Sequence, residues 1–185
     1  YFNKNNEIEN FITKGSIEDA KINYEKEIFL ENTNFTFFAD NTDILIKSFL
    51  GKFGPLDIKD GDAKIQISPE ISIETNFLSN IKIDNKLKKE YDFLNQFLNL
   101  NSLDNLNGEF NNTLFVNLDK TLKIKNFNFK NSGKIINAKL NFQKSIKNFL
   151  LEESLKFIIV KDTEINTLIN SNKNNIEIKG KYSFN

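Results

Sequence analysis

Apolar side chains recur in this chain at every second residue, the spacing that puts alternate side chains on one face of a β-strand. The clearest run places Ile136, Ala138, Leu140 and Phe142 between polar residues. Similar alternation is found within residues 64–74, 81–83, 114–118, 122–130 and 176–179. Strands with one apolar and one polar face are typical of antiparallel sheets, whereas strands of buried parallel sheets are apolar on both faces. The pattern therefore predicts a mainly β protein.

Short turn signals separate these runs. They lie at Gly15, 40–43, 51–55, Asp60-Gly61, Asp119-Lys120 and 131–133. Asp60-Gly61 indicates a two-residue hairpin, because Gly accepts the positive φ of a type I′ turn. Since almost no crossover helix separates the strands, consecutive strands should pair as an antiparallel meander.

One segment has helical spacing instead. Leu87, Tyr91, Leu94 and Leu98 form an apolar stripe and predict one amphipathic helix over residues 86–99. The favoured interpretation is that this stripe packs on the apolar face of the sheet, and the alternative is a helix that lies on a membrane surface. A second short helix is predicted at 145–153. We therefore expect residues 1–185 to form a single β-rich segment of a larger protein, with a helical insertion near 85–100.

Composition excludes much catalytic chemistry. The chain has 25 basic and 25 acidic residues, every basic residue is Lys, and His, Cys, Met and Trp are absent. It therefore offers no Ser-His pair, no thiolate and no usual transition-metal site, and we expect no enzyme, no catalytic residue, no metal and no cofactor. Zero net charge and the lack of Arg also argue against nucleic-acid binding.

Two acidic groups suggest chemistry only weakly. Asp57, Asp60 and Asp62 surround Gly61, but the spacing is wrong for an EF-hand, so an acidic hairpin turn is the favoured interpretation. The neighbouring carboxylates Glu152 and Glu153 are interpreted as a solvated face.

What remains is a long, one-sided apolar surface rich in Ile and Phe. Either the sheet folds over and buries this surface as a sandwich core, or it curls into an open trough that shelters something apolar.

Several stretches of the sequence resemble the repeated β-rich region of AsmA-like envelope proteins, and the likeness is nearest to the large YhdP/TamB type found in AT-rich bacteria. These stretches are 15–20, 34–37, 58–63, 106–110 and 118–124, the last leading to 132–135. The resemblance implies a curled, groove-like extended sheet in the periplasm of a Gram-negative cell envelope. Such a protein would be anchored to the inner membrane through a region outside this segment, and would take part in outer membrane biogenesis.

The resemblance also implies a function in lipid transport. Members of this superfamily are non-enzymatic bridges whose apolar β-groove binds phospholipid acyl chains and conducts them between inner and outer membranes. The implied partners are phospholipid acyl chains and neighbouring β segments of the same chain. The implied groove lining is Phe35, Phe37, Ile44, Ile46, Ile65, Ile67, Ile71, Ile73, Ile81, Ile83, Leu122, Ile124, Phe127, Phe129, Ile136, Leu140 and Phe142, with Lys and Asn of the opposite face in the periplasm.

Two alternatives stay open. One is a surface or adhesin-like β domain with a sealed core and an interaction role. The other is a carbohydrate-binding domain of jelly-roll type, which the absence of Trp and the presence of only 4 Tyr disfavour.

Overall fold

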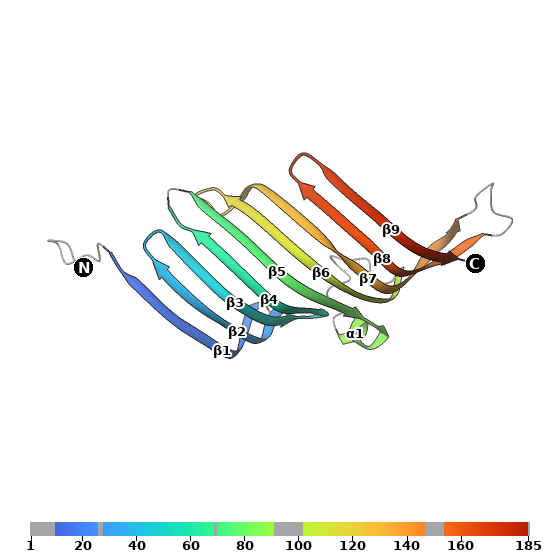
Figure 1. The fold of residues 1–185 in the computed structure, drawn as a ribbon, viewed down its shortest axis with the longest axis horizontal. Helices are drawn as coiled ribbons and strands as arrows, with labels where there is room; N and C mark the ends of the chain where they lie inside the picture. The colour runs from blue at the N-terminus through green and yellow to red at the C-terminus, as the bar shows by residue number, and fades with distance from the viewer. Residues whose placement is uncertain (1–9, 26–27, 69, 91–101, 147–153, 185) are drawn as a thin grey trace.

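The structure is a computed structural model that describes residues 10–25, 28–68, 70–90, 102–146 and 154–184. These residues form one nine-stranded sheet in which each strand pairs antiparallel with the next in sequence order (Figure 1). The predicted mainly β fold and its antiparallel meander are thus confirmed. β1 and β9 are the two edges of the sheet, so the sheet is open.

The strands are long, between 11 and 23 residues each. Their bounds are β1 (Ile12–Glu25), β2 (Ile28–Asp40), β3 (Asp43–Phe53), β4 (Leu56–Gln66), β5 (Ile71–Ile83), β6 (Leu103–Leu118), β7 (Ile124–Ile146), β8 (Leu155–Asn170) and β9 (Asn174–Phe184). The one helix among the described residues is α1 (Asn85–Glu90), between β5 and β6.

Three predicted turns are wrong, because their glycines lie inside strands. Asp60-Gly61 lies in the middle of β4, Gly15 lies in β1, and 131–133 lies in β7. The predicted turn at 51–55 is confirmed, since Gly54-Pro55 makes the hairpin between β3 and β4, where Gly54 has φ 57° and Phe53 pairs with Leu56. Pro55 lacks the N–H that would continue a ladder, so it ends the strand, whereas a Gly can stay within one.

At the opposite end of the sheet, three hairpins share one hydrogen-bonding pattern. The Oδ1 atoms of Asp40, Asp119 and Asn170 each accept hydrogen bonds from backbone N–H groups two to four residues further on, at 2.7–3.0 Å. Such Asx turns satisfy backbone donors that the ladder leaves free. The turn signals at 40–43 and at Asp119-Lys120 are therefore confirmed.

The described part of the predicted helix begins at Asn85. Oδ1 of Asp84 accepts hydrogen bonds from the backbone N–H groups of Lys86 and Leu87, both at 2.9 Å, which caps the helix. Leu87 packs against Ile83 of β5, as Leu106 of β6 does, so α1 covers one end of the sheet face on which Ile83 lies. Residues 91–101 of the predicted helix lie outside the described residues.

The second predicted helix is wrong at its start. Residues 145 and 146 belong to β7, because the strand alternation that begins at Ile124 continues past Phe142. Residues 147–153, with Glu152 and Glu153, lie outside the described part of the chain.

Candidate apolar binding face

One row of directly paired residues crosses all nine strands. Each member lies opposite the next on the neighbouring strand, and directly opposite residues point to the same side of a sheet. The row is Gly15, Phe37, Ile46, Ala63, Thr75, Leu114, Phe129, Ile169 and Asn174. It contains no charged residue.

Parallel rows extend this surface along the strands. Toward the Asx turns runs the row Ala39, Ile44, Ile65, Ile73, Val116 and Phe127. Three more rows lie toward α1. The first is Gly61, Phe77, Asn112, Asn131, Thr167 and Ile176, and the second is Ile58, Ser79, Phe110, Gly133, Ile165 and Ile178. The third is Ile83, Leu106, Ala138, Val160 and Tyr182. We call these five rows together the apolar face.

The apolar face is not sealed within the described residues. The buried apolar side chains in the described part of the chain are Ala39, Ile83 and Ala138. At the β9 edge Ile176, Ile178 and Tyr182 are 59–70% exposed. The described strands form a single sheet, so no second sheet packs on this face.

The accessible surface of the chain is correspondingly large. It is 13280 Å² for a mass of 21.5 kDa. A compact folded monomer of this mass exposes about 9,200 Å². The excess agrees with an open sheet whose apolar side has no facing layer among the described residues.

The side chains that are fully buried are small. Thr33, Ser79 and Thr163 are exposed by 2% or less, and all three lie on the apolar side of the sheet. Strand glycines lie among them under Phe rings: a Cβ at Gly15 would come within 2.9 Å of the Phe37 ring, and one at Gly108 within 2.7 Å of the Phe110 ring. Small residues under large rings let neighbouring backbones bend closely toward this side.

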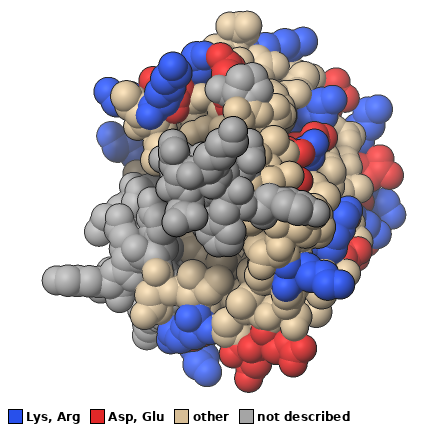
Figure 2. All heavy atoms as spheres, turned by 90° about the vertical axis from the view of Figure 1, so that its left-hand side faces the viewer, with Lys and Arg blue, Asp and Glu red and all other residues tan. Residues whose placement is uncertain are grey.

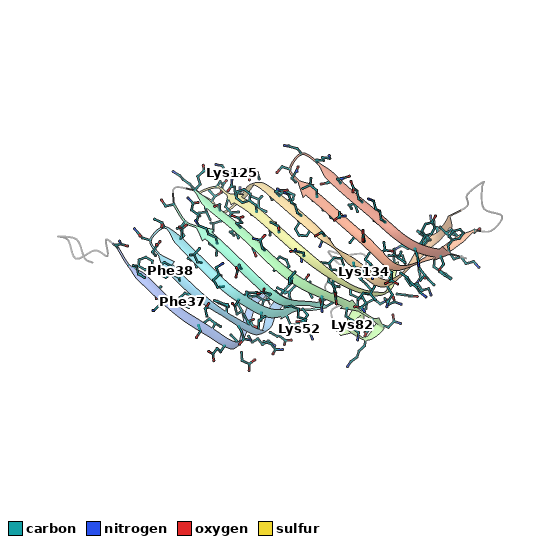
Figure 3. All side chains as sticks on the ribbon, in the orientation of Figure 1. Phe37, Phe38, Lys52, Lys82, Lys125 and Lys134 are labelled. Carbon is teal, nitrogen blue, oxygen red and sulfur yellow. The ribbon has the colours of Figure 1, made fainter. Side chains whose placement is uncertain are left out.

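The opposite face carries the charges. One row on it alternates in sign across four strands, with Glu109, Lys134, Glu164 and Lys179 directly paired in turn. Phe37 and Phe38 show the two sides, since they are successive residues of β2 (Figure 3). In the view from the β1 end, charged side chains lie mostly around the outer edge of the outline (Figure 2).

Ion pairs link strands across this charged face. Nζ of Lys47 lies 2.6 Å from Asp62 Oδ2, and Nζ of Lys134 lies 2.8 Å from Asp162 Oδ1. The hydrogen bond from Lys47 lowers the pKa of Asp62, and the hydrogen bond from Lys134 lowers the pKa of Asp162. These pairs are exposed, so each adds little to the free energy of unfolding, and their main effect is to keep this face hydrated.

The charged face also has two open hollows over β4 to β9, of about 400 and 620 Å³. Polar and charged side chains such as Asn111, Ser132, Lys134 and Asn166 line them. Most of their lining residues belong to the charged side of the sheet. Their open shape and mixed polar lining are typical of a hydrated surface.

The structure places most of the predicted lining residues on the apolar side. Directly paired there are Phe35, Phe37, Ile44, Ile46, Ile65, Ile71, Ile73, Ile81, Ile83, Phe127, Phe129 and Leu140. Phe142 shares their strand parity in β7, two residues beyond Leu140.

Ile124 also lies on the apolar side, because it is paired with Leu118, which is paired with Ile71, and it is 64% exposed there. Three predicted lining residues lie elsewhere. Leu122 is in the turn before β7, with φ 62°, and Ile67 follows the end of β4. Ile136 is an extra residue in β7 where the register with β6 shifts between Asn107 and Gly108, so it has no directly opposite partner in β6. The alternation of apolar and polar residues continues through the turn, the strand end and the register shift, so the sequence prediction included these residues.

The sequence prediction also missed members of the apolar face. Ile17, Phe49, Phe77, Phe110, Leu114, Ile135 and Ile165 lie on this side, and the rings of Phe35 and Phe49 are 5.9 Å apart. Several of them have a polar residue or a glycine two positions away, as Leu114 has Asn112, so the apolar alternation is interrupted in the sequence. Usable signals were the shared parity of Leu114 with Val116 and of Phe77 with Ile73.

The described residues contain no group of three or more acidic side chains that could hold a metal ion. No helix in the same part of the chain is long and apolar enough to span a membrane. Comparison with known proteins finds no matching protein-family model, no matching curated protein and no matching solved structure.

Proposed function

We propose that this chain binds phospholipid acyl chains on its apolar face. It would do so as a non-enzymatic segment of an AsmA-like envelope protein that conducts lipid between inner and outer membranes. The observation that carries the proposal is the charge-free row from Gly15 to Asn174, which crosses every strand and has no facing layer among the described residues. A monomer rarely leaves so large an apolar surface to water without a ligand or partner.

The dimensions of the face suit an acyl chain. Adjacent strands lie about 4.8 Å apart, so nine strands span about 38 Å across the sheet. One leaflet of a bilayer is about 15 Å of hydrocarbon, half of the usual core. An acyl chain lying across the strands would therefore contact three or four of them, and the face has room for more than one such chain.

The two edges of the sheet support a role within a longer assembly. Backbone groups of β1 and β9 on their outer sides have no strand partner among the described residues, and the apolar rows reach β9 at Ile176, Ile178 and Tyr182. Neighbouring β segments of the same chain would continue the face beyond each edge. The anchor to the inner membrane and the periplasmic location belong to the same proposal.

Lipid extraction tests the proposed function. The protein, purified without detergent from a Gram-negative host, should carry phospholipid that mass spectrometry detects in at least equimolar amount. The matched control is Ile46→Glu, which places a carboxylate in the middle of the nine-strand row and should lower the bound lipid. Lipid-free protein that remains soluble and folded would contradict the proposal and favour the surface-domain alternative.

A further inference from the structure

Polar side chains of three neighbouring strands lie side by side in one row of the apolar face. Asn112 of β6, Asn131 of β7 and Thr167 of β8 are directly paired in one row, and Phe77 and Ile176 flank them in that row. The adjacent row toward the Asx turns has Leu114, Phe129 and Ile169 at the same strands. Neutral hydrogen-bonding groups thus stand in otherwise apolar surroundings.

Asn112 uses its amide inside the sheet. It is 5% exposed, its Nδ2 donates to Ser79 Oγ at 2.9 Å and to the Phe77 carbonyl at 3.3 Å, and its Oδ1 accepts from Asn131 Nδ2 at 2.7 Å. The side chain is buried and its amide is paired at both atoms, so its role is structural.

Asn131 and Thr167 keep hydrogen-bonding capacity. The bond to Asn112 uses one N–H of the Asn131 amide and fixes the orientation of that amide, which leaves its second N–H. Within the described part of the chain, the Thr167 hydroxyl has no hydrogen-bond partner. Neither this hydroxyl nor the Asn131 amide is among the buried polar atoms that lack a hydrogen-bond partner. Both residues are half-buried.

We infer that the Thr167 hydroxyl and the free N–H of Asn131 bind the ester carbonyl of an acyl lipid whose chain lies on the apolar face. This inference rests on the proposed function and names the chemical group that the face recognises. An ester carbonyl is neutral and only accepts hydrogen bonds, so it matches two neighbouring donors.

The lack of charge selects against anionic groups at this position. None of the rows that make up the apolar face contains a charged residue. A carboxylate or phosphate placed there would lose hydration with no cation to compensate, which is costly. The neutral ester at the head of an acyl chain is therefore the part of a lipid that this position suits.

The substitution Thr167→Val tests the inference, because it removes the hydroxyl, keeps the β-branched shape and breaks no hydrogen bond among the described residues. The matched control is Ser72→Ala, which also removes one hydroxyl, but on the charged side of the sheet, at a residue paired with Gln66 and Asn117. The probes are methyl palmitate and an alkane of matching length, and binding is measured by equilibrium partitioning into the purified full chain.

Thr167→Val should weaken binding of the ester about fivefold, the effect of one hydrogen bond, and leave alkane binding unchanged. Ser72→Ala should change neither, and Thr167→Ser, which retains a hydroxyl, should restore ester binding. If Thr167→Val binds the ester as tightly as the unsubstituted protein does, and the alkane likewise, this inference is overturned and the proposed function stands. Failure of the unsubstituted protein to bind either probe would overturn both.

Discussion

The ring of Phe110 on β6 lies directly over Gly133 on β7. The two residues are paired in register, and a Cβ at Gly133 would come within 2.7 Å of the ring and would also overlap the backbone oxygen of Glu109. The same ring covers Gly108, two residues earlier in its own strand. One aromatic side chain thus occupies the space of two missing side chains on the apolar side.

Gly133→Ala should therefore destabilise the sheet. The added methyl group meets backbone atoms, which cannot move aside as a flexible side chain can, so the strands β6 and β7 must separate. We expect a loss of about 2–3 kcal/mol in the free energy of unfolding. Urea unfolding followed by circular dichroism measures it.

Gly51→Ala is the matched control, since the nearest atoms to a Cβ there belong to side chains, the Phe49 ring at 3.3 Å and the Thr33 hydroxyl at 3.6 Å. A ring edge can shift by a few tenths of an ångström, so the expected loss is about 1 kcal/mol or less. Equal losses at the two positions would show that contact with the backbone of β6 is not what makes Gly133 necessary.

The buried threonines Thr33 and Thr163 should respond to valine in opposite directions. Both are exposed by 1% or less, but the hydroxyl of Thr163 donates to the Lys161 carbonyl at 2.9 Å, whereas that of Thr33 has no partner within the described residues. Thr33→Val removes an unsatisfied group and should raise the free energy of unfolding by about 1 kcal/mol, while Thr163→Val should lower it by about 1 kcal/mol. Thermal melts of the two variants, measured together, check the sign. A lower melting temperature for Thr33→Val would mean that its hydroxyl is satisfied in solution.

The alternation of apolar and polar residues was sufficient to predict the sheet and one of its faces. The alternation puts Ile44, Ile65 and Ile73 each on the apolar side of its own strand, and in the structure the three residues lie in a single row. Antiparallel pairing of sequence neighbours then follows from the short connections. No tertiary information was needed for these features.

The glycines could not be interpreted from local sequence. Asp60-Gly61 has the residues of a tight turn, yet Gly61 pairs with Phe77 inside the sheet, and a Cβ there would lie 3.1 Å from the Cβ of Phe77. Whether a Gly makes a turn or provides space for a neighbouring strand depends on which residue lies opposite it. That partner is set by register with another strand, which the local pattern does not contain.

The polar position on the apolar face was unpredictable for the same reason. Asn112 and Asn131 are 19 residues apart and meet only through the register of β6 with β7. In a chain with so many Asn residues, neither stands out in the sequence. The shift of register at Ile136 likewise comes from pairing between strands.

Acid should destabilise the Asx turns. Hydrogen bonds from Thr42 lower the pKa of Asp40, and those from Thr121 and Lys123 lower the pKa of Asp119. Each carboxylate therefore contributes stability that is complete above its unfolded pKa, near 3.8, and is lost as pH falls through the lower folded pKa. The free energy of unfolding should thus fall below about pH 4, as measured by urea titration at a series of pH values.

The double variant Asp40→Asn, Asp119→Asn separates these turns from other acidic groups. An amide oxygen accepts the same backbone bonds, as Asn170 does in the third turn, but it does not titrate in this range. The variant should fold at neutral pH and lose less stability than the unsubstituted protein on acidification. An unchanged acid dependence would place the titration instead in ion pairs, which join Asp62 to Lys47, Asp104 to Lys139 and Asp162 to Lys134.

A carboxylate at Ile73 distinguishes an open face from a sealed core. Ile73 is half-buried between Ile65 and Val116 on the apolar face, and its neighbour Ser72 lies between Gln66 and Asn117 on the opposite side. In a dry core, Ile73→Glu would cost several kcal/mol of a total of about 5–15 and would largely unfold the domain. On an open face the carboxylate reaches water, so we expect a folded variant with a modest loss of melting temperature and weaker photo-crosslinking to phospholipid in cells. Ser72→Glu, on the hydrated side, should change neither measurement. Unfolding of Ile73→Glu would indicate that another layer covers this face, and undiminished crosslinking in a folded variant would show that lipid does not lie over Ile73.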